Sequence, residues 1–416
     1  MVILGVNPSY FVGYIEHSQF ISISPLSEES VTVNTRWSRQ LAPVGQGCLV
    51  YDIGTTDPAQ ACTDVLAQLG LSDLREWVIA EPAHMPIGAG LSLRLGSVQA
   101  NAWAPGLDTL QLAANLQLDT TGNVQDLIRE IVVSMLMGPV AFEFPSIQEL
   151  VSAVRIRVNI VQAARKTTLA FHTSEAERPQ DFWMYDEDRG FIIRAGVSLI
   201  RALEMATQPE MSGAMYSFSC YRASEYVILL GIAQELAHCN PPLLAQLQSM
   251  WGTHPIKSGK FHEVFLHEQG SMEAPLPPCY FVPGDRTWFR NPDEASADAS
   301  GFEGSWVMYL GGGLFNNFWK RDQPYTLTAK CLEIFHWRHG LYKDAAGEER
   351  MDEEKVAQLV AASMQDADAL AGIMAVMSRY REARGVYTAA GGCIDTTREF
   401  ARWVCPATAD LVLPQS

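Results

Sequence analysis

The sequence predicts an α+β protein of 416 residues with more than one domain. Three observations lead to this fold class. Short β-rich runs alternate with helical patterns over about the first 140 residues, a helix that begins at Cys220 precedes two further β-rich runs, and periodic helical segments end the chain. Because single hydrophobic cores stop growing at about 250 to 300 residues, we expect a chain of this length to divide into domains.

The first 140 residues predict a small N-terminal α/β domain. The runs 47–53 and 77–80 are rich in strand-forming residues, and residues 58–69 have the spacing of a helix that ends at Gly70. The region carries no motif that indicates a chemical reaction. We interpret residues 1–140 as a binding, targeting or chaperone-contact module.

Two amphipathic helices are predicted near the end of this region, one before and one after residue 140. Apolar residues between Val124 and Leu136 recur at the spacing of one helix face, and Gly138 and Pro139 end the pattern, which marks a domain joint. A second helix is predicted over residues 147–165. Its three arginines are most simply solvated or paired with carboxylates.

The stretch 215–230 places Cys220 where a polar approach gives way to an apolar helical run. A thiol at a helix N-terminus meets unpaired backbone N–H groups and the positive end of the helix dipole, which favour the thiolate. Cys220 is therefore a candidate nucleophile. The alternative is a buried structural cysteine, since free cysteine behaves as a small hydrophobic residue.

Two strands are predicted after the Cys220 helix. A polar turn at residues 282–285, which we expect Asp285 to fix with its own side chain, leads into residues 286–290, and a second β-rich run covers 302–311. Antiparallel strands after a cysteine-headed helix are the order found in papain-like amidohydrolase cores. We expect that core over residues 141–345 and a helical C-terminal extension over 346–416.

Composition limits the partners and the compartment. The 47 acidic and 30 basic residues give a formal charge of −17, which argues against nucleic acid or an anionic membrane as the main partner. The first residues have no basic, apolar pattern of a secretory signal, and the eight cysteines include no C-x-x-C pair. A cytoplasmic protein is the default expectation, and export without a signal peptide stays open. Oligomeric state is not indicated.

The run from about Val151 to Gly340 resembles the bacterial, spore-coat-type protein-glutamine gamma-glutamyltransferases, or transglutaminases. The matching pieces occur in family order; among them are the helix around Arg155, the cysteine-headed helix, and the segments 282–292 and 307–311. The resemblance implies a papain-like cysteine transamidase core in which Cys220 attacks a glutamine carboxamide of a protein substrate. Ammonia leaves, and an amine acceptor resolves the thioester. The resemblance implies no cofactor.

The acid and base positions of this family differ here. Ser219 stands where the family has an acidic residue, Ser305 where it has its catalytic glutamate, and residues 317–319 where it has Gly-His-Gly. Because strand side chains alternate faces, Glu303 is predicted to point to the same side as Ser305 and is the candidate replacement. His336 and His339, which with Glu333 recur every three residues of a predicted helix, are the candidate imidazoles.

Two hypotheses remain open from the sequence. One is cysteine-dependent acyl transfer, either crosslinking or deamidation of glutamine. The other is a catalytically silent relative that binds a protein or peptide in the same cleft, as an effector or its accessory. A zinc site is not predicted, because His262 and His267 would lie about 140° apart on one helix.

Overall fold

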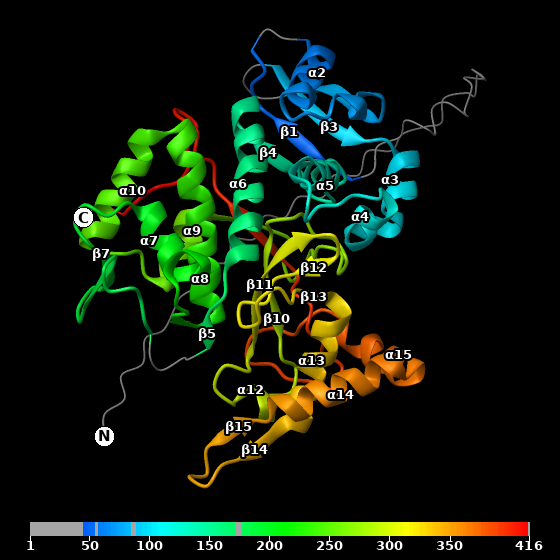
Figure 1. The fold of residues 1–416 in the computed structure, drawn as a ribbon. Helices are drawn as coiled ribbons and strands as arrows, with labels where there is room; N and C mark the ends of the chain where they lie inside the picture. The colour runs from blue at the N-terminus through cyan, green and yellow to red at the C-terminus, as the bar shows by residue number, and fades with distance from the viewer. Residues whose placement is uncertain (1–44, 55–56, 85–88, 172–175, 415–416) are drawn as a thin grey trace, which may run out of the picture.

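Two β-sheets and a layer of long helices organise the chain (Figure 1). The structure, a computed structural model, describes residues 45–54, 57–84, 89–171 and 176–414. The N-terminal residues, for which the sequence predicts no secretory signal, lie outside the described residues. Helices and strands alternate through the described ranges, so the prediction of a mixed helix-and-sheet fold is confirmed.

The first sheet has four strands in the order β2-β3-β1-β4. β1 pairs parallel with β4 and antiparallel with β3, which in turn pairs antiparallel with β2. Helix α2 begins as predicted: the Asp57 carboxylate accepts the backbone N–H of Ala59 at 3.0 Å, and Pro58 fits the first helical position. The elements are β1 (Cys48–Val50), α2 (Pro58–Gln68), β2 (Val78–His84), β3 (Ala89–Leu95), α3 (Ser97–Trp103), α4 (Leu112–Asn115), α5 (Val124–Leu136) and β4 (Phe142–Phe144).

A helical layer lies next in the chain. α6 (Ile147–Lys166) and α9 (Cys220–Cys239) pack side by side, and α7 (Leu199–Thr207) and α10 (Pro241–Thr253) flank α9 on its other side (Figure 1). All residues of α9 from 223 to 233 are buried, as expected for a helix inside a core. Shorter elements connect these helices: β5 (Ala170–Phe171), β6 (Trp183–Asp186), β7 (Gly190–Ile193), α8 (Pro209–Ser212), β8 (Ser217–Phe218) and α11 (Ser258–Phe265).

The second sheet has six strands in the order β13-β12-β11-β10-β16-β9. β10 and β11 are antiparallel, as predicted, with Trp288 opposite Trp306. β16 comes last among these strands in the chain but lies between β10 and β9. The prediction that residues 346–416 are a helical extension is therefore wrong in part, because α15 ends at Met377 and residues 398–401 complete the sheet as a strand. The elements are β9 (Leu266–Gln269), β10 (Arg286–Arg290), α12 (Glu294–Ala297), β11 (Gly304–Gly311), β12 (Leu314–Phe315), β13 (Tyr325–Thr326) and β16 (Arg398–Ala401).

Three helices and a hairpin cover one end of this sheet. α13 (Leu327–Gly340) leads into the hairpin of β14 (Leu341–Lys343) and β15 (Glu349–Met351), and α14 (Glu353–Gln365) and α15 (Ala367–Met377) then pack on α13 (Figure 1). No single helix among the described residues has the length and hydropathy of a membrane span. α14 and α15 pass that test only as a pair, and they are bent by 111° at their junction.

The buried apolar residues form two clusters. The larger cluster joins the first sheet to the α6–α9 layer, and the smaller one lies between the second sheet and α13 to α15. The division of the chain at residues 140 and 345 stays a prediction. β4, which follows the first of these boundaries, belongs to the sheet that precedes it.

Candidate active site

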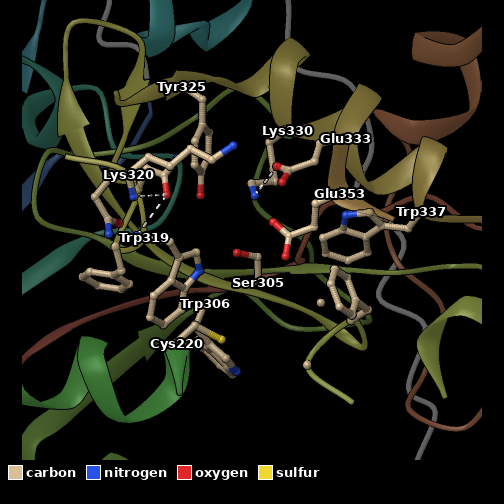
Figure 2. A pocket seen from close by; sticks show the side chains of 16 residues that line it. Cys220, Ser305, Trp306, Trp319, Lys320, Tyr325, Lys330, Glu333, Trp337 and Glu353 are labelled. Atoms are coloured by element: carbon tan, nitrogen blue, oxygen red, sulfur yellow. Dashed lines mark hydrogen bonds and ion pairs between the residues drawn. The ribbon is translucent and has the colours of Figure 1, made fainter. Parts of the chain in front are cut away.

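A cavity of about 110 Å³ lies at the N-terminal end of α9, and Cys220 is part of its wall (Figure 2). The other walls come from the start of β11, the segment 316–320, α13 and the first residue of α14. Cys220 packs against the larger apolar cluster, whereas Phe302 and Tyr325 pack against the smaller one. The cavity therefore lies where the two cores meet.

Cys220 is the first residue of α9, as predicted. Ser219 precedes it in extended conformation and caps the helix, because its hydroxyl oxygen accepts the backbone N–H of Arg222 at 3.3 Å. The approach to the cysteine is also fixed: the guanidinium of Arg178 lies 3.4 Å from the centre of the Phe218 ring. The residue that departs from the family pattern at position 219 thus has a structural role at the head of the helix.

The electrostatics of the thiol are mixed. Burial raises the pKa of Cys220 above its usual value, and the negative charge of Glu303 raises it further. The backbone N–H groups of Trp306 and Tyr221 and the charge of Lys330 act in the opposite direction, since all three stabilise a thiolate. The net effect is an elevated pKa, so the resting group is a thiol at neutral pH.

Trp306 is held beside Cys220 by a set of aromatic and cationic contacts. Its ring stacks on Trp288 with centroids 6.1 Å apart, meets the Tyr221 ring edge-on at 5.3 Å, and lies 4.6 Å from the Arg286 guanidinium carbon. Close approach of the two strands requires glycine at position 304, where a Cβ atom would lie 2.3 Å from Trp288 Nε1. These contacts fix the backbone N–H that faces the thiol.

Lys330 on α13 places a buried positive charge in the cavity. Its ammonium pairs with Glu333 at 2.5 Å and lies 4.3 Å from the centre of the Tyr325 ring. Burial alone would lower the pKa of Lys330, but the Glu333 charge and Tyr325 outweigh burial and hold the pKa above its usual value. Burial raises the pKa of Tyr325 to about 12, so this side chain is a neutral phenol.

Two of the predicted site residues lie at the start of β11. Ser305 lines the cavity together with Cys220. Glu303 is exposed and does not line the cavity, because β11 begins at Gly304 and Glu303 lies in the bend before it. Glu303 is nevertheless close enough to affect the pKa of Cys220. Its assignment as the proton acceptor stays a prediction.

The two predicted imidazoles lie elsewhere. His336 is buried and contacts Ser363 Oγ of α14 through Nε2 at 2.8 Å and His339 Nδ1 through Nδ1 at 3.1 Å. Burial lowers the pKa of His336, and the neighbouring His339 and Arg338 add to the decrease. Neither imidazole lines the cavity, because residues three apart on a helix differ by about 60° in direction and only Glu333 of the three points to it.

Sequence reasoning missed two charged residues of this site. Lys330 has a local signal, since it stands one helical turn before Glu333, but nothing in the sequence ties that pair to Cys220. Glu353 reaches the cavity from the start of α14, after the β14–β15 hairpin (Figure 2). Its placement depends on long-range packing and has no local sequence signal.

One group of possible metal ligands lies outside the cavity. Ligand atoms of His262, Glu268 and Glu399 lie within 4.8 Å of one another. Glu399 is paired with Arg286, and His262 contacts both carboxylates, so ion pairing accounts for the group. His262 and His267 do not share a helix, because α11 ends at Phe265 and His267 lies on β9. The His267 ring contacts the Asp410 carboxylate at 2.6 Å.

Comparisons with known proteins identify the class. A sequence model of the protein-glutamine gamma-glutamyltransferases matches residues 109–400, which is more than half of the chain. A protein-glutamine gamma-glutamyltransferase of Halalkalibacterium halodurans is 24% identical over 218 residues, covering 50% of this chain and 70% of that protein. A solved transglutaminase from Geobacillus stearothermophilus, without its C-terminal extension, aligns with 52% of this chain and 98% of its own at 19% identity and a TM-score of 0.35.

The protein is thus a transferase by family. It belongs to the protein-glutamine gamma-glutamyltransferase family, as the resemblance noted in the sequence predicted. This membership supports transamidation of protein glutamine in general.

Proposed function

We propose that this protein transfers the acyl group of a protein-bound glutamine through a thioester on Cys220. The observation that carries the proposal is the position of Cys220, at the head of α9 and in the wall of a cavity that also holds a buried cation. α9 packs on β11 of an antiparallel sheet, which is the arrangement expected of a papain-like core. The catalytic region in this proposal is residues 141–345.

The proposed acylation step begins from the neutral thiol. The sulfur of Cys220 attacks the carboxamide carbon of glutamine, the C–N bond breaks, and the thiol proton leaves with ammonia. The N–H groups of Trp306 and Tyr221 and the ammonium of Lys330 stabilise negative charge on the sulfur as the proton departs. These groups take over the electrostatic part of the role that an imidazolium has in other cysteine enzymes.

The thioester is then resolved in one of two ways. Attack by a primary amine on the thioester carbon forms an isopeptide bond and releases the thiolate, whereas attack by water converts the glutamine to glutamate. We propose the first as the main reaction and deamidation as the variant. The substrates are therefore a protein glutamine and an amine acceptor.

Incorporation of a fluorescent primary amine into a glutamine-rich protein tests the proposal. Cys220→Ala abolishes incorporation, whereas the matched variant Cys239→Ala, at the opposite end of α9 and also partly buried, retains it. Brief treatment of the acylated enzyme with hydroxylamine releases the substrate as a hydroxamate only when Cys220 is present. Incorporation that survives in Cys220→Ala would overturn the proposed function.

A further inference from the structure

The cavity contains a carboxylate that is available for a ligand. Glu353 is the first residue of α14, and its side chain points into the cavity toward Ser305, the residue at the family's glutamate position (Figure 2). Within the part of the chain that the structure describes, no hydrogen bond or ion pair engages this carboxylate. The other carboxylate of the cavity, Glu333, is already paired with Lys330. Among the described residues, Glu353 is therefore the carboxylate of the cavity that has no side-chain partner.

The backbone at Glu353 is held in a fixed position. The N–H of Asp352 donates to the carbonyl of Gly340 at 2.9 Å, and the Asp352 carboxylate caps α14 by accepting the N–H of Lys355 at 2.9 Å. The contact with the end of α13 is close, since a Cβ atom at Gly340 would lie 2.5 Å from Val356 Cγ2. The backbone that carries Glu353 is thus set against α13 by packing.

Aromatic rings form the wall beside this carboxylate. Trp337 and Phe302 both line the cavity and meet edge to face with centroids 5.2 Å apart. Aromatic faces bind alkyl chains and attract cations, and a carboxylate beside them binds an ammonium. A primary ammonium on a methylene chain therefore fits this wall, with its chain on the rings and its charge at the carboxylate. Ser305 lies between Glu353 and Cys220 in Figure 2.

We propose that Glu353, Trp337 and Phe302 form the subsite for the acyl-acceptor amine, and that Glu353 takes the proton that activates it. This inference rests on the proposed function. The ammonium of the acceptor transfers one proton to the Glu353 carboxylate, and the free amine attacks the thioester carbon. The C–N bond forms, the C–S bond breaks, the thiolate takes the second nitrogen proton, and Glu353 returns its proton to solvent.

The test separates acylation from acceptor use in the full-length protein. Ammonia release from a glutamine peptide reports acylation, and incorporation of monodansylcadaverine reports attack by a cationic amine. In Glu353→Gln, ammonia release by hydrolysis continues, while amine incorporated per ammonia released falls by about a hundredfold, the low end of the effect of a general base. Glu354→Gln, the adjacent exposed residue of α14, keeps the wild-type ratio.

Two further measurements distinguish proton transfer from a structural role. Hydroxylamine is mostly neutral at pH 7 and needs no base to remove a proton, so its incorporation by Glu353→Gln stays within about a factor of two of wild type. A disturbed cavity would instead lower the incorporation of hydroxylamine and of the cationic amine equally. Glu353→Asp recovers part of the loss for the cationic amine. An unchanged ratio in Glu353→Gln, with ammonia release that depends on Cys220, overturns the subsite alone. A wild-type protein that releases no ammonia from glutamine peptides overturns the proposed function and the subsite with it.

Discussion

Glu130 is a buried carboxyl group whose titration we expect to control stability near neutral pH. It lies on α5, and its carboxylate accepts the Gly312 N–H at 2.9 Å and the Tyr309 hydroxyl at 2.9 Å, which anchors the end of β11. Burial raises the pKa of Glu130 to about 7, although these hydrogen bonds and the charge of Arg165 oppose the increase. The perturbation is Glu130→Gln, which keeps an acceptor oxygen but no longer titrates.

The size of the effect follows from the two pKa values. The Glu130 carboxyl group has a pKa of 4.5 in the unfolded chain and of about 7 in the folded protein. The folded state therefore holds the proton more tightly, and the stability that this provides is complete below pH 4.5 and is lost as the pH rises to 7. At 1.36 kcal/mol for each pH unit, the loss is about 3 kcal/mol across this window.

Urea denaturation at pH 5 and pH 7.5, followed by tryptophan fluorescence, measures this difference. Each protein gives a change in the free energy of unfolding between the two pH values. Subtracting the change for Glu130→Gln from that for wild type cancels the contributions of groups that titrate in both proteins. We expect the variant to gain about 2 kcal/mol relative to wild type between the two pH values, because the unfolded chain is still partly protonated at pH 5 and the folded protein at pH 7.5. The exposed residue Glu76 gives the control, since Glu76→Gln should show no such gain. A stability difference between Glu130→Gln and wild type that does not vary with pH would refute the reasoning.

Two other predictions concern single charges. Glu303→Gln removes a charge that raises the pKa of Cys220, so iodoacetamide should label the thiol faster than in wild type at pH 7.5; slower labelling would contradict the assigned sign. Asp285→Ala leaves the buried Arg157, now paired at 2.7 Å, without its partner and should lower the free energy of unfolding by about 3 to 5 kcal/mol. Asp186→Ala, which breaks an exposed pair, should change urea stability little, and equal effects of the two variants would show that burial does not set the cost.

The elements that the sequence predicted correctly are those with local patterns. The helix at Cys220 combines a capping serine with an apolar run, and β10 and β11 carry clusters of strand-forming residues. Asp285 accepts the Val282 N–H at 2.7 Å, so the prediction that it fixes its own turn is confirmed. Each of these features depends on residues close together in the chain.

The rest of the site depends on contacts that no local pattern records. The predicted strand over 302–311 includes Glu303, but β11 begins two residues later, at Gly304, where the backbone lies too close to Trp288 for a Cβ atom. His336 and His339 are on the predicted helix, yet the direction in which each points follows from the packing of α13 on α14. Glu353 enters the cavity only because a hairpin returns the chain toward α13.

The position of β16 has a consequence for biosynthesis. Residues 398–401 supply the strand between β10 and β9, so the sheet that bears Trp306 is incomplete until residue 401 has left the ribosome. A nascent chain that ends before this strand exposes unpaired edges on β10 and β9, which other chains can pair with. The strand that carries Trp306 is thus synthesised almost ninety residues before the strand that joins β10 to β9.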